Sequence, residues 1–363
     1  MRRQTSGSVA EPFRFFLHKG VSRAKESAYI EAFGQRIGLT RQDVVLSLRG
    51  RNIRGASAEG GSLHSYEPIK RMLWISPNHL DAAYMPLHVE AAVTHRVSFI
   101  QGYSSAVYEL ARWLEFHPAP RFTEAVRGVQ LFSESADEGM VALIERVFGC
   151  PVLVHYGHSE RAVMAGSMPD DHRYFVWPLY GHVELIDEAG RPITEPGVQG
   201  EVVATAFDNK VMPFIRYRTG DLAMWSAGPA HPALPGYPVL ERIDGRNNDY
   251  FVGADGRRIP VASLGGLRPP EFLLIEASQY EQFEPGQLIV RLQSAVPLDP
   301  CVLEVIRNYF KVKLLGCVDT ELEVVSHIAR TARGKRRLMI QHITDERRQP
   351  VAGTLAANGN TLQ

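Results

Sequence analysis

The chain has 363 residues, enough for about two domains of roughly 150 residues each. Hydrophobic residues make up 45% of it and charged residues 22%, a globular composition that excludes disordered, collagen-like and heptad-repeat classes. Because 40 lysines and arginines balance 40 aspartates and glutamates, the basic field that nucleic-acid binding relies on is missing, and we expect no nucleic-acid partner.

The sequence predicts neither a membrane span nor an export signal. No run approaches the roughly 18 apolar residues of a spanning helix, and the first apolar stretch, 13–17, is short and contains an arginine. Cys150, Cys301 and Cys317 form no C-x-x-C pair, which argues against a zinc knuckle or a disulfide framework. We therefore expect a soluble cytoplasmic protein in which Cys150 is packed rather than catalytic.

Short apolar runs alternate with longer helical patterns from residue 13 to about residue 178. Runs rich in Val, Ile, Leu and Phe predict strands at 13–17, 44–48, 72–75, 97–100, 128–132 and 152–156. The clearest helix is predicted over 136–148, where Ser135 and Glu138 offer a capping box. This order predicts a mainly parallel sheet covered by helices, with ligands bound at the carboxyl ends of its strands.

After residue 178 the pattern changes to strands separated by turn residues. We predict strands at 182–187, 200–206, 214–217 and 222–225, which indicates antiparallel sheet. A second unit follows Arg246, with strands predicted near 272–277, 288–292 and 321–325 and a helix over 300–312. The predicted fold class is α/β, with a large N-terminal domain of mixed sheets and helices and a small α+β C-terminal domain.

The first segment with chemical potential is the loop formed by Thr5, Ser6, Gly7 and Ser8. Small hydroxyl residues around a glycine leave backbone N–H groups free to converge on phosphate oxygens. A plain turn explains the same composition, so the loop acquires meaning only together with the other segments.

The second segment runs from Tyr156 to Glu160 and follows a predicted buried strand. The Tyr156 ring can stack on a flat base, Gly157 allows close backbone approach, and the Glu160 carboxylate can bind Mg²⁺. His155 and His158 suggest a metal pair, but no third ligand has suitable spacing, so a hydrogen-bonding role is favoured. A strand-end turn is the alternative.

Three more sites carry charge next to a glycine. Asp221 follows Gly220 at a predicted strand start, where its carboxylate can accept hydrogen bonds from the two hydroxyls of a ribose. Arg246 can contact phosphate or ribose, and Lys335 can swing from Gly334 onto a phosphate as a compact point charge. The first two also fit ordinary turns, and the basic run around Lys335 also fits a solvated surface.

In order and approximate spacing, these five segments resemble the adenylate-forming superfamily. The chain is most similar to the phenylacetate–CoA ligase branch, and within it to the capsular-polysaccharide CapK-like members. The resemblance runs from Thr5 to about Ile343. The closer similarity rests on segments 101–105, 132–135, 148–149, 156–161, 212–223, 245–246 and 249–252.

The resemblance implies a two-step reaction that uses ATP, Mg²⁺ and coenzyme A on a small-molecule carboxylate. The carboxylate attacks the α-phosphate of ATP to give an acyl-adenylate, and a thiol then displaces AMP. Carried over by motif, Lys335 and Glu160 are catalytic, Glu160 also binds the metal, and Asn248 is the hinge. The implied ATP- and AMP-binding residues are Thr5, Ser6, Gly7, Ser8, Ser133, Glu134, Tyr156, Gly157, Asp221 and Arg246.

The resemblance also implies domain limits. We expect an AMP-binding adenylation domain over 1–247, a mobile C-terminal α+β domain over 248–343 and a disordered tail over 344–363. The family normally has a further stretch before the phosphate loop, whereas four residues precede Thr5 here. The expectation is therefore an N-terminally truncated adenylation domain, with an inactive nucleotide-binding remnant as one alternative.

A second alternative keeps adenylation but passes the acyl group to a sugar or amine acceptor instead of coenzyme A. The acid itself is not specified by the motifs. Candidate pocket residues are Tyr103, Ser104, His158 and Arg161, and their side chains favour a polar or aromatic carboxylate.

Overall fold

The computed structural model describes residues 2–4, 13–49, 63–75, 80, 83–246, 250–256, 258–264, 269–314, 316–330 and 337–343. The helices are α1 (Ser22–Gln35), α2 (Met85–Thr94), α3 (Ser104–Phe116), α4 (Pro120–Thr123), α5 (Glu138–Phe148) and α6 (Pro300–Lys313), with 3₁₀ turns at Val261–Leu264 and Pro270–Leu274.

The strands of the first part of the chain are β1 (Arg2–Gln4), β2 (Arg14–Phe16), β3 (Val45–Leu48), β4 (His64–Glu67), β5 (Met72–Ile75), β6 (Phe99–Tyr103), β7 (Val129–Phe132), β8 (Val152–Gly157), β9 (Met164–Met168), β10 (Asp171–Val176), β11 (Gly181–Ile186), β12 (Pro192–Ile193), β13 (Gln199–Ala206), β14 (Tyr217–Trp225) and β15 (Val239–Arg246). Those that follow are β16 (Tyr250–Val252), β17 (Arg258–Pro260), β18 (Ala277–Gln282), β19 (Gln287–Gln293), β20 (Asp319–Val325) and β21 (Met339–Gln341).

One large mixed sheet dominates the first unit. Its strand order is β12-β11-β13-β14-β15-β10-β9-β8-β7-β6-β3-β5-β4. The pairs from β5 through β3, β6 and β7 to β8 are parallel, and the pairs from β8 to β12 are antiparallel. This confirms the predicted change from parallel to antiparallel sheet, and the α/β fold class with it.

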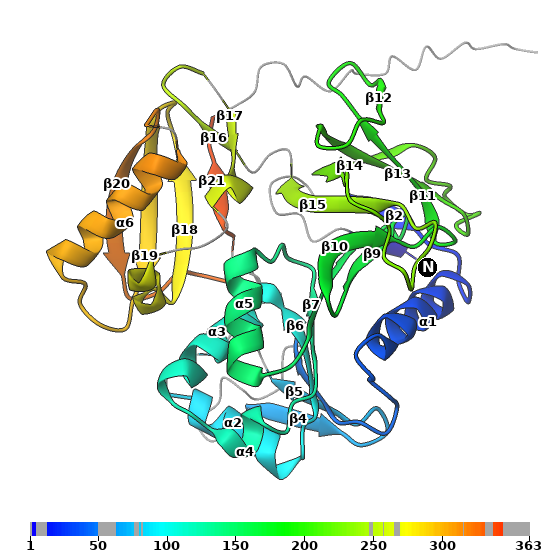
Figure 1. Ribbon diagram of the computed structural model, residues 1–363, viewed down its shortest axis with the longest axis horizontal. Helices are drawn as coiled ribbons and strands as arrows, with labels where there is room; N and C mark the ends of the chain where they lie inside the picture. The colour runs from blue at the N-terminus through cyan, green and yellow to red at the C-terminus, as the bar shows by residue number, and fades with distance from the viewer. Residues whose placement is uncertain are drawn as a thin grey trace, which may run out of the picture.

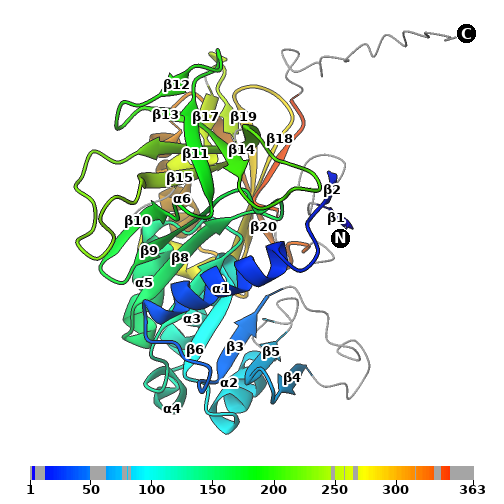
Figure 2. The same cartoon turned by 90° about the vertical axis from the view of Figure 1, so that its right-hand side faces the viewer.

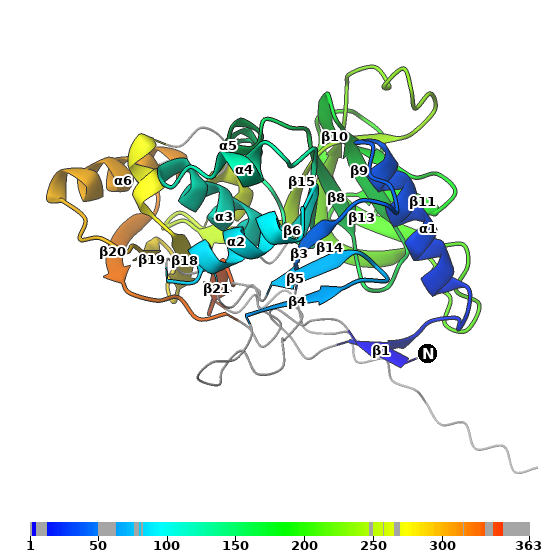
Figure 3. The same cartoon turned by 90° about the horizontal axis from the view of Figure 1, so that it is seen from below.

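Helices cover both faces of the parallel part. Helices α2, α3 and α5 lie on one face, between the sheet and the C-terminal unit, while α1 crosses the other face (Figures 1 and 3). Arg36, just after α1, donates hydrogen bonds to the carbonyls of Gly166 and Ser167 on β9, at 2.9 and 2.7 Å. Only glycine fits at position 166, because a Cβ there would lie 2.4 Å from the Phe33 ring. These contacts fasten α1 onto the sheet. Figure 2 shows α1 running across the front of the strands.

The start of α5 differs from the predicted capping box. The N-cap is Asp137, whose carboxylate accepts a hydrogen bond from the Met140 N–H at 3.0 Å, so Ser135 lies outside the helix. An ionised Asp at the N-cap satisfies a free backbone donor and also opposes the positive end of the helix dipole. The helix ends at Gly149, which takes the left-handed conformation that favours glycine.

Three predicted features need correction. Strand β14 covers all of predicted strand 222–225 but only Tyr217 of predicted strand 214–217. Within β14, Gly220 has a φ of 77°, and the pairing of β14 with both neighbouring strands shifts register. Asp221 therefore lies inside a strand, at a bulge, and not at a strand start. The hairpin of β9 and β10 was not predicted, and the first half of predicted strand 272–277 lies in a 3₁₀ turn, with β18 beginning at Ala277.

The C-terminal unit has its own core. A four-stranded sheet of order β20-β19-β18-β21 packs against α6, and its buried cluster includes Phe251, Val290, Ile306 and Phe310. The larger core of the first unit draws on residues 15–240. Two separate cores agree with the predicted large and small units (Figure 1). Among the described helices, none is long and apolar enough to cross a membrane.

Candidate functional site

The carboxyl ends of three parallel strands lie side by side and carry several of the predicted residues. Tyr103 ends β6 and pairs with Phe132, the last residue of β7, while Tyr156 lies near the end of β8. Ser133 and Glu134 follow β7 directly. This is the edge at which the sequence predicts a ligand site, because parallel sheets bind ligands beyond their carboxyl ends.

Tyr156 and Asp221 are joined by a hydrogen bond. The Tyr156 hydroxyl donates to Asp221 Oδ2 at 2.7 Å, across 65 positions of sequence. Burial, and then the charge of Asp221, raises the pKa of Tyr156 well above its ordinary value, so the phenol stays protonated. Two residues that the sequence assigned to the adenine and the ribose of one nucleotide therefore lie within one hydrogen bond of each other.

The bulge in β14 fixes the position of Asp221. Glu201 on β13 accepts a hydrogen bond from the Gly220 N–H at 3.2 Å and also pairs with Arg218. On the other side of β14, the backbone of Asp221 pairs with the backbone of Arg246 on β15. The strand pairing thus places the two predicted ribose-binding residues opposite each other.

Glu160 is a buried carboxylate with two partners. Its Oε1 accepts a hydrogen bond from the Tyr217 hydroxyl at 2.7 Å, and its Oε2 lies 3.2 Å from His158 Nδ1. Burial alone would raise the pKa of Glu160, but the His158 ring and the Tyr217 hydroxyl outweigh it and hold that pKa below its ordinary value. The group is therefore an anion at neutral pH.

The donor set is suited to one kind of metal site. No group of three or more His, Cys, Asp or Glu side chains with metal-ligand geometry occurs among the described residues. An all-protein cage is therefore not formed by that part of the chain. Mg²⁺ commonly binds one or two carboxylates together with phosphate oxygens of a substrate, and the ionised Glu160 fits that pattern.

Ser133 and Glu134 follow β7 in the chain, and Glu134 is hydrogen-bonded to the start of α3. Ser133 has a φ of 65°, a strained value for a residue that is not glycine. Glu134 Oε2 accepts a hydrogen bond from the Ser105 N–H at 3.0 Å, and its backbone carbonyl accepts one from the Ser104 hydroxyl. Glu134 Oε1 is buried and has no hydrogen-bond partner among the described residues, so this oxygen can accept one from a ligand.

The two histidines of the segment behave differently. His155 is enclosed by Phe33 and Phe132, with ring centroids 5.7 and 4.9 Å away. Burial, and then the charge of Arg49, lowers the pKa of His155 to about 3, so its ring is neutral. His158 instead faces Glu160. The expectation that they do not form a metal pair agrees with this separation of their surroundings.

Several predicted residues lie outside the described part of the chain. These are Thr5, Ser6, Gly7 and Ser8 of the phosphate loop, the hinge residue Asn248 and the lysine Lys335. Conversely, the sequence assigned no role to Tyr217, which begins the segment of Asp221, and did not single out Glu201 or Arg49. Tyr217 and Glu201 act through partners 57 and 19 positions away, and no local pattern marks such contacts.

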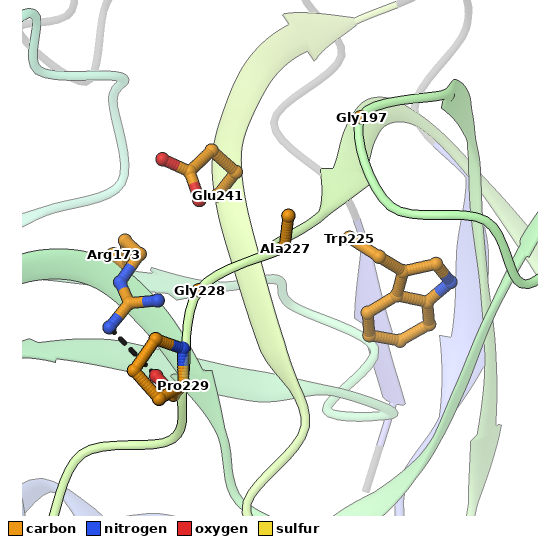
Figure 4. Close-up of a pocket in the computed structure, with 7 residues that line it drawn as sticks. All are labelled: Arg173, Gly197, Trp225, Ala227, Gly228, Pro229 and Glu241. Atoms are coloured by element: carbon orange, nitrogen blue, oxygen red, sulfur yellow. Dashed lines mark hydrogen bonds between the residues drawn. The ribbon is translucent and has the colours of Figure 1, made fainter.

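A pocket of about 570 Å³ opens elsewhere on the antiparallel region (Figure 4). It is lined by Arg173, Gly197, Trp225, Ala227, Gly228, Pro229 and Glu241, and it includes none of the predicted site residues. Arg173 is already paired with Asp171 and donates to the Pro229 carbonyl at 3.1 Å. The buried carboxylate of Glu160 and the hydrogen-bonded Tyr156 lie instead at the strand ends.

No protein-family model matches the chain. Protein CapK from Staphylococcus aureus is 23% identical over 352 residues, which are 93% of this chain and 74% of that protein. Phenylacetate-coenzyme A ligase from Pseudomonas putida is 30% identical over 77 residues, 21% of this chain and 17% of that protein. Similarity to CapK therefore extends along nearly the whole chain, whereas similarity to the ligase is local.

Solved structures that resemble the chain include coenzyme A ligases. 2-Hydroxyisobutyryl-CoA ligase in the postadenylation state gives a TM-score of 0.70 over 96% of this chain and 74% of that chain, at 19% identity. The same enzyme in the thioesterification state gives 0.55. O-succinylbenzoate coenzyme A synthetase from Bacillus subtilis with AMP gives 0.58 over 93% of this chain and 67% of that chain, at 18% identity. The chain therefore has the fold of these coenzyme A ligases, which is the fold that the motif resemblance implies.

Proposed function

We propose that the chain activates a carboxylic acid with ATP and then transfers the acyl group to coenzyme A. In the first step a carboxylate oxygen bonds to the α-phosphorus of ATP and the bond to pyrophosphate breaks. In the second step the coenzyme A sulfur bonds to the acyl carbon, AMP leaves, and the thiol proton is released. The observation that carries this proposal is the Tyr156–Asp221 hydrogen bond at the strand ends, in a fold shared with ligases solved with acyl-AMP.

Each described residue has a task in this proposal. Tyr156 lines the adenine pocket, and Asp221 and Arg246 bind the ribose hydroxyls from neighbouring strands. Glu134 Oε1 accepts a hydrogen bond from the nucleotide, which would satisfy this buried oxygen. Glu160 holds Mg²⁺, and that ion would offset the repulsion between two anionic reactants. Thr5, Ser6, Gly7 and Ser8 hold phosphates, and Lys335 neutralises charge that develops at the α-phosphate.

The domain limits belong to the proposal as well. We assign adenylation to 1–247 and the mobile domain to 248–343, with Asn248 as the hinge between the half-reactions. A cytoplasmic location is supported by Cys150, Cys301 and Cys317, which are all free. The neutral net charge supports small-molecule partners.

The decisive experiment measures carboxylate-dependent pyrophosphate release over a panel of acids, with the adenylate trapped as a hydroxamate. Glu160→Gln is expected to lower the rate about 100-fold or more, because one well-placed electrostatic group typically contributes that much. Tyr156→Phe is the matched variant for nucleotide binding, since it removes a single hydroxyl and its bond to Asp221. If ATP protects the chain against heat but no acid releases pyrophosphate, the chain is a nucleotide-binding remnant and the proposal fails.

A second candidate keeps the first step and changes the acceptor. The observation that favours it is the similarity to CapK over 93% of the chain, against 21% for phenylacetate-coenzyme A ligase. In this candidate a sugar or an amine, and not a thiol, displaces AMP. Supplying preformed adenylate with coenzyme A, amino sugars or amines separates the two, since only the true acceptor releases AMP.

A further inference from the structure

Arg49 stands out among the arginines near the strand ends. It follows β3 directly, and the register of β3, β6, β7 and β8 aligns it with Tyr103, Phe132 and His155 across adjacent strands. Its guanidinium carbon lies 4.5 Å from the centroid of the Phe132 ring. A cation stacked on an aromatic face keeps its N–H donors directed outward, free for an anion in the plane of the group.

In the part of the chain that the structure describes, no carboxylate lies within ion-pair distance of Arg49, and no atom accepts a hydrogen bond from it. The charged group that acts on it is Glu26, from farther away. That carboxylate accepts a hydrogen bond from the Tyr180 hydroxyl and lies 3.9 Å from Arg161 Nε. Two guanidinium groups thus share one carboxylate that already has a partner, which leaves one positive charge in excess.

Two other partly enclosed arginines have acceptors. Arg36 donates to two carbonyls, and Arg330 pairs with Glu109. Among the described residues, half-buried Arg49 has no such partner, and Arg161 has a buried Nη1 without a hydrogen-bond partner. A positive charge partly withdrawn from water without an anion beside it is unfavourable, so these two guanidinium groups point to an anion that arrives with a ligand.

The face of the sheet indicates which ligand that is. Successive side chains of a strand point to opposite faces, so His155 and Tyr156 lie on different sides of β8. Arg49 contacts Phe132 and acts on His155, whereas Tyr156 is bonded to Asp221. Arg49 therefore faces away from the residues proposed to bind the nucleotide, which leaves the acid as the reactant that would bring an anion to it.

We propose that Arg49, with Arg161 beside Glu26, forms an anion subsite that binds a second carboxylate of the substrate. This rests on the proposed function, and it names the substrate class as dicarboxylic acids. A guanidinium binds a carboxylate through two parallel hydrogen bonds, which sets both affinity and orientation. The distal carboxylate lies at Arg49, and the other carboxylate reacts at the α-phosphate.

The test compares acids that differ by one carboxylate: terephthalate with benzoate, and adipate with hexanoate. In pyrophosphate release we expect kcat/KM to favour each diacid by about 10- to 100-fold, the usual effect of a charged hydrogen bond. Arg49→Met is expected to remove that preference, and Arg49→Lys to keep part of it. A second readout needs no turnover: each diacid raises the unfolding temperature of the wild type but not of Arg49→Met.

Arg49→Met also tests whether the cation is unpaired. It is expected to raise the unfolding temperature without ligand, whereas the matched variant Arg36→Met, which removes two hydrogen bonds, lowers it. If Arg49→Met does not fold, Arg49→Lys provides the comparison.

Equal kcat/KM for both members of each pair, unchanged by Arg49→Met, would refute the subsite and leave the ligase proposal standing. Loss of ATP affinity in Arg49→Met, with diacid binding intact, would assign the cation to phosphate and overturn the dicarboxylate proposal. Diacid-dependent stabilisation that requires Arg49, without pyrophosphate release from any acid, would uphold the subsite and reject the ligase function.

Discussion

Replacing Arg330 with methionine is expected to loosen the contact between the two units. Arg330 Nη2 lies 2.6 Å from Glu109 Oε2 on α3, and the two side chains are only 8% and 6% exposed. One turn along α3, Arg112 donates to the Leu273 carbonyl at 2.9 Å and lies 3.5 Å from Glu276. Removing the cation from a buried pair typically costs about 3–5 kcal/mol, because the remaining charge stays desolvated.

The chain can avoid this cost by separating the units, which returns Glu109 to water. A penalty of about 3 kcal/mol corresponds to roughly a 150-fold change in the ratio of the joined to the separated arrangement. Fluorescence energy transfer can measure that ratio. Cys301 on α6 is exposed, and Ile69 is 94% exposed, so Cys301 and Ile69→Cys serve as label sites after the other two cysteines are replaced. The expected result is lower transfer efficiency in Arg330→Met.

The matched control is Arg307→Met. Arg307 pairs with Glu304 at 2.7 Å on α6, but these side chains are 49% and 59% exposed, so the pair contributes about 0.5 kcal/mol or less and transfer should not change. Glu109→Gln combined with Arg330→Met completes a double-mutant cycle that isolates the pair. If Arg330→Met lowers the unfolding temperature but leaves the transfer distribution unchanged, the pair stabilises the fold without setting how the units sit.

Three further outcomes are expected. Gly181→Ala should lower the free energy of unfolding by about 3 kcal/mol, because its Cβ would lie 2.0 Å from the Ala162 carbonyl oxygen; an unchanged denaturation midpoint would contradict this. Burial, and then the charge of a nearby glutamate, raises the pKa of the Cys150 thiol to about 12, so at pH 8 iodoacetamide should modify exposed Cys301 far faster; peptide mass spectrometry would reveal the reverse. Burial alone would raise the pKa of Glu281, but hydrogen bonds from neighbouring cationic side chains lower it below 4.5, so this group stabilises the fold above that pH and the contribution is lost as the pH falls. Glu281→Gln should therefore reduce the gap between the unfolding temperatures at pH 7 and pH 4, and an equal gap in both proteins would refute the assignment.

The parallel half of the fold could be predicted because its strands are buried on both faces. Such strands appear in the sequence as short continuous apolar runs, as at the start of β8. The hairpin of β9 and β10 has no such signal. Its first strand contains Gly166 and Ser167, and the turn contains Asp170. That strand is buried because Phe33 of α1 packs onto Gly166, a contact that depends on tertiary structure.

The candidate site also has features with a local sequence signal and features that depend on tertiary contacts. Tyr156, Asp221 and Glu160 could be proposed because each adjoins a glycine or a strand end in a recognisable motif. Their mutual hydrogen bonds could not, because the sheet brings together segments 57 and 65 positions apart. The residues next to Arg49 in the sequence form no recognisable motif. The role proposed for Arg49 depends on Phe132 and His155, which the parallel register places beside it.

The docking of α1 has a consequence for how the chain is made. The carbonyl groups that receive Arg36 belong to residues 130 and 131 positions later, so this helix precedes its own binding surface. A ribosome adding 5–20 residues per second needs on the order of ten seconds to synthesise that interval. During this time Phe33 and the apolar side of α1 stay uncovered in the nascent chain. Helix α1 is therefore expected to depend on chaperones until β9 has been made, and slower translation before β9 should increase aggregation.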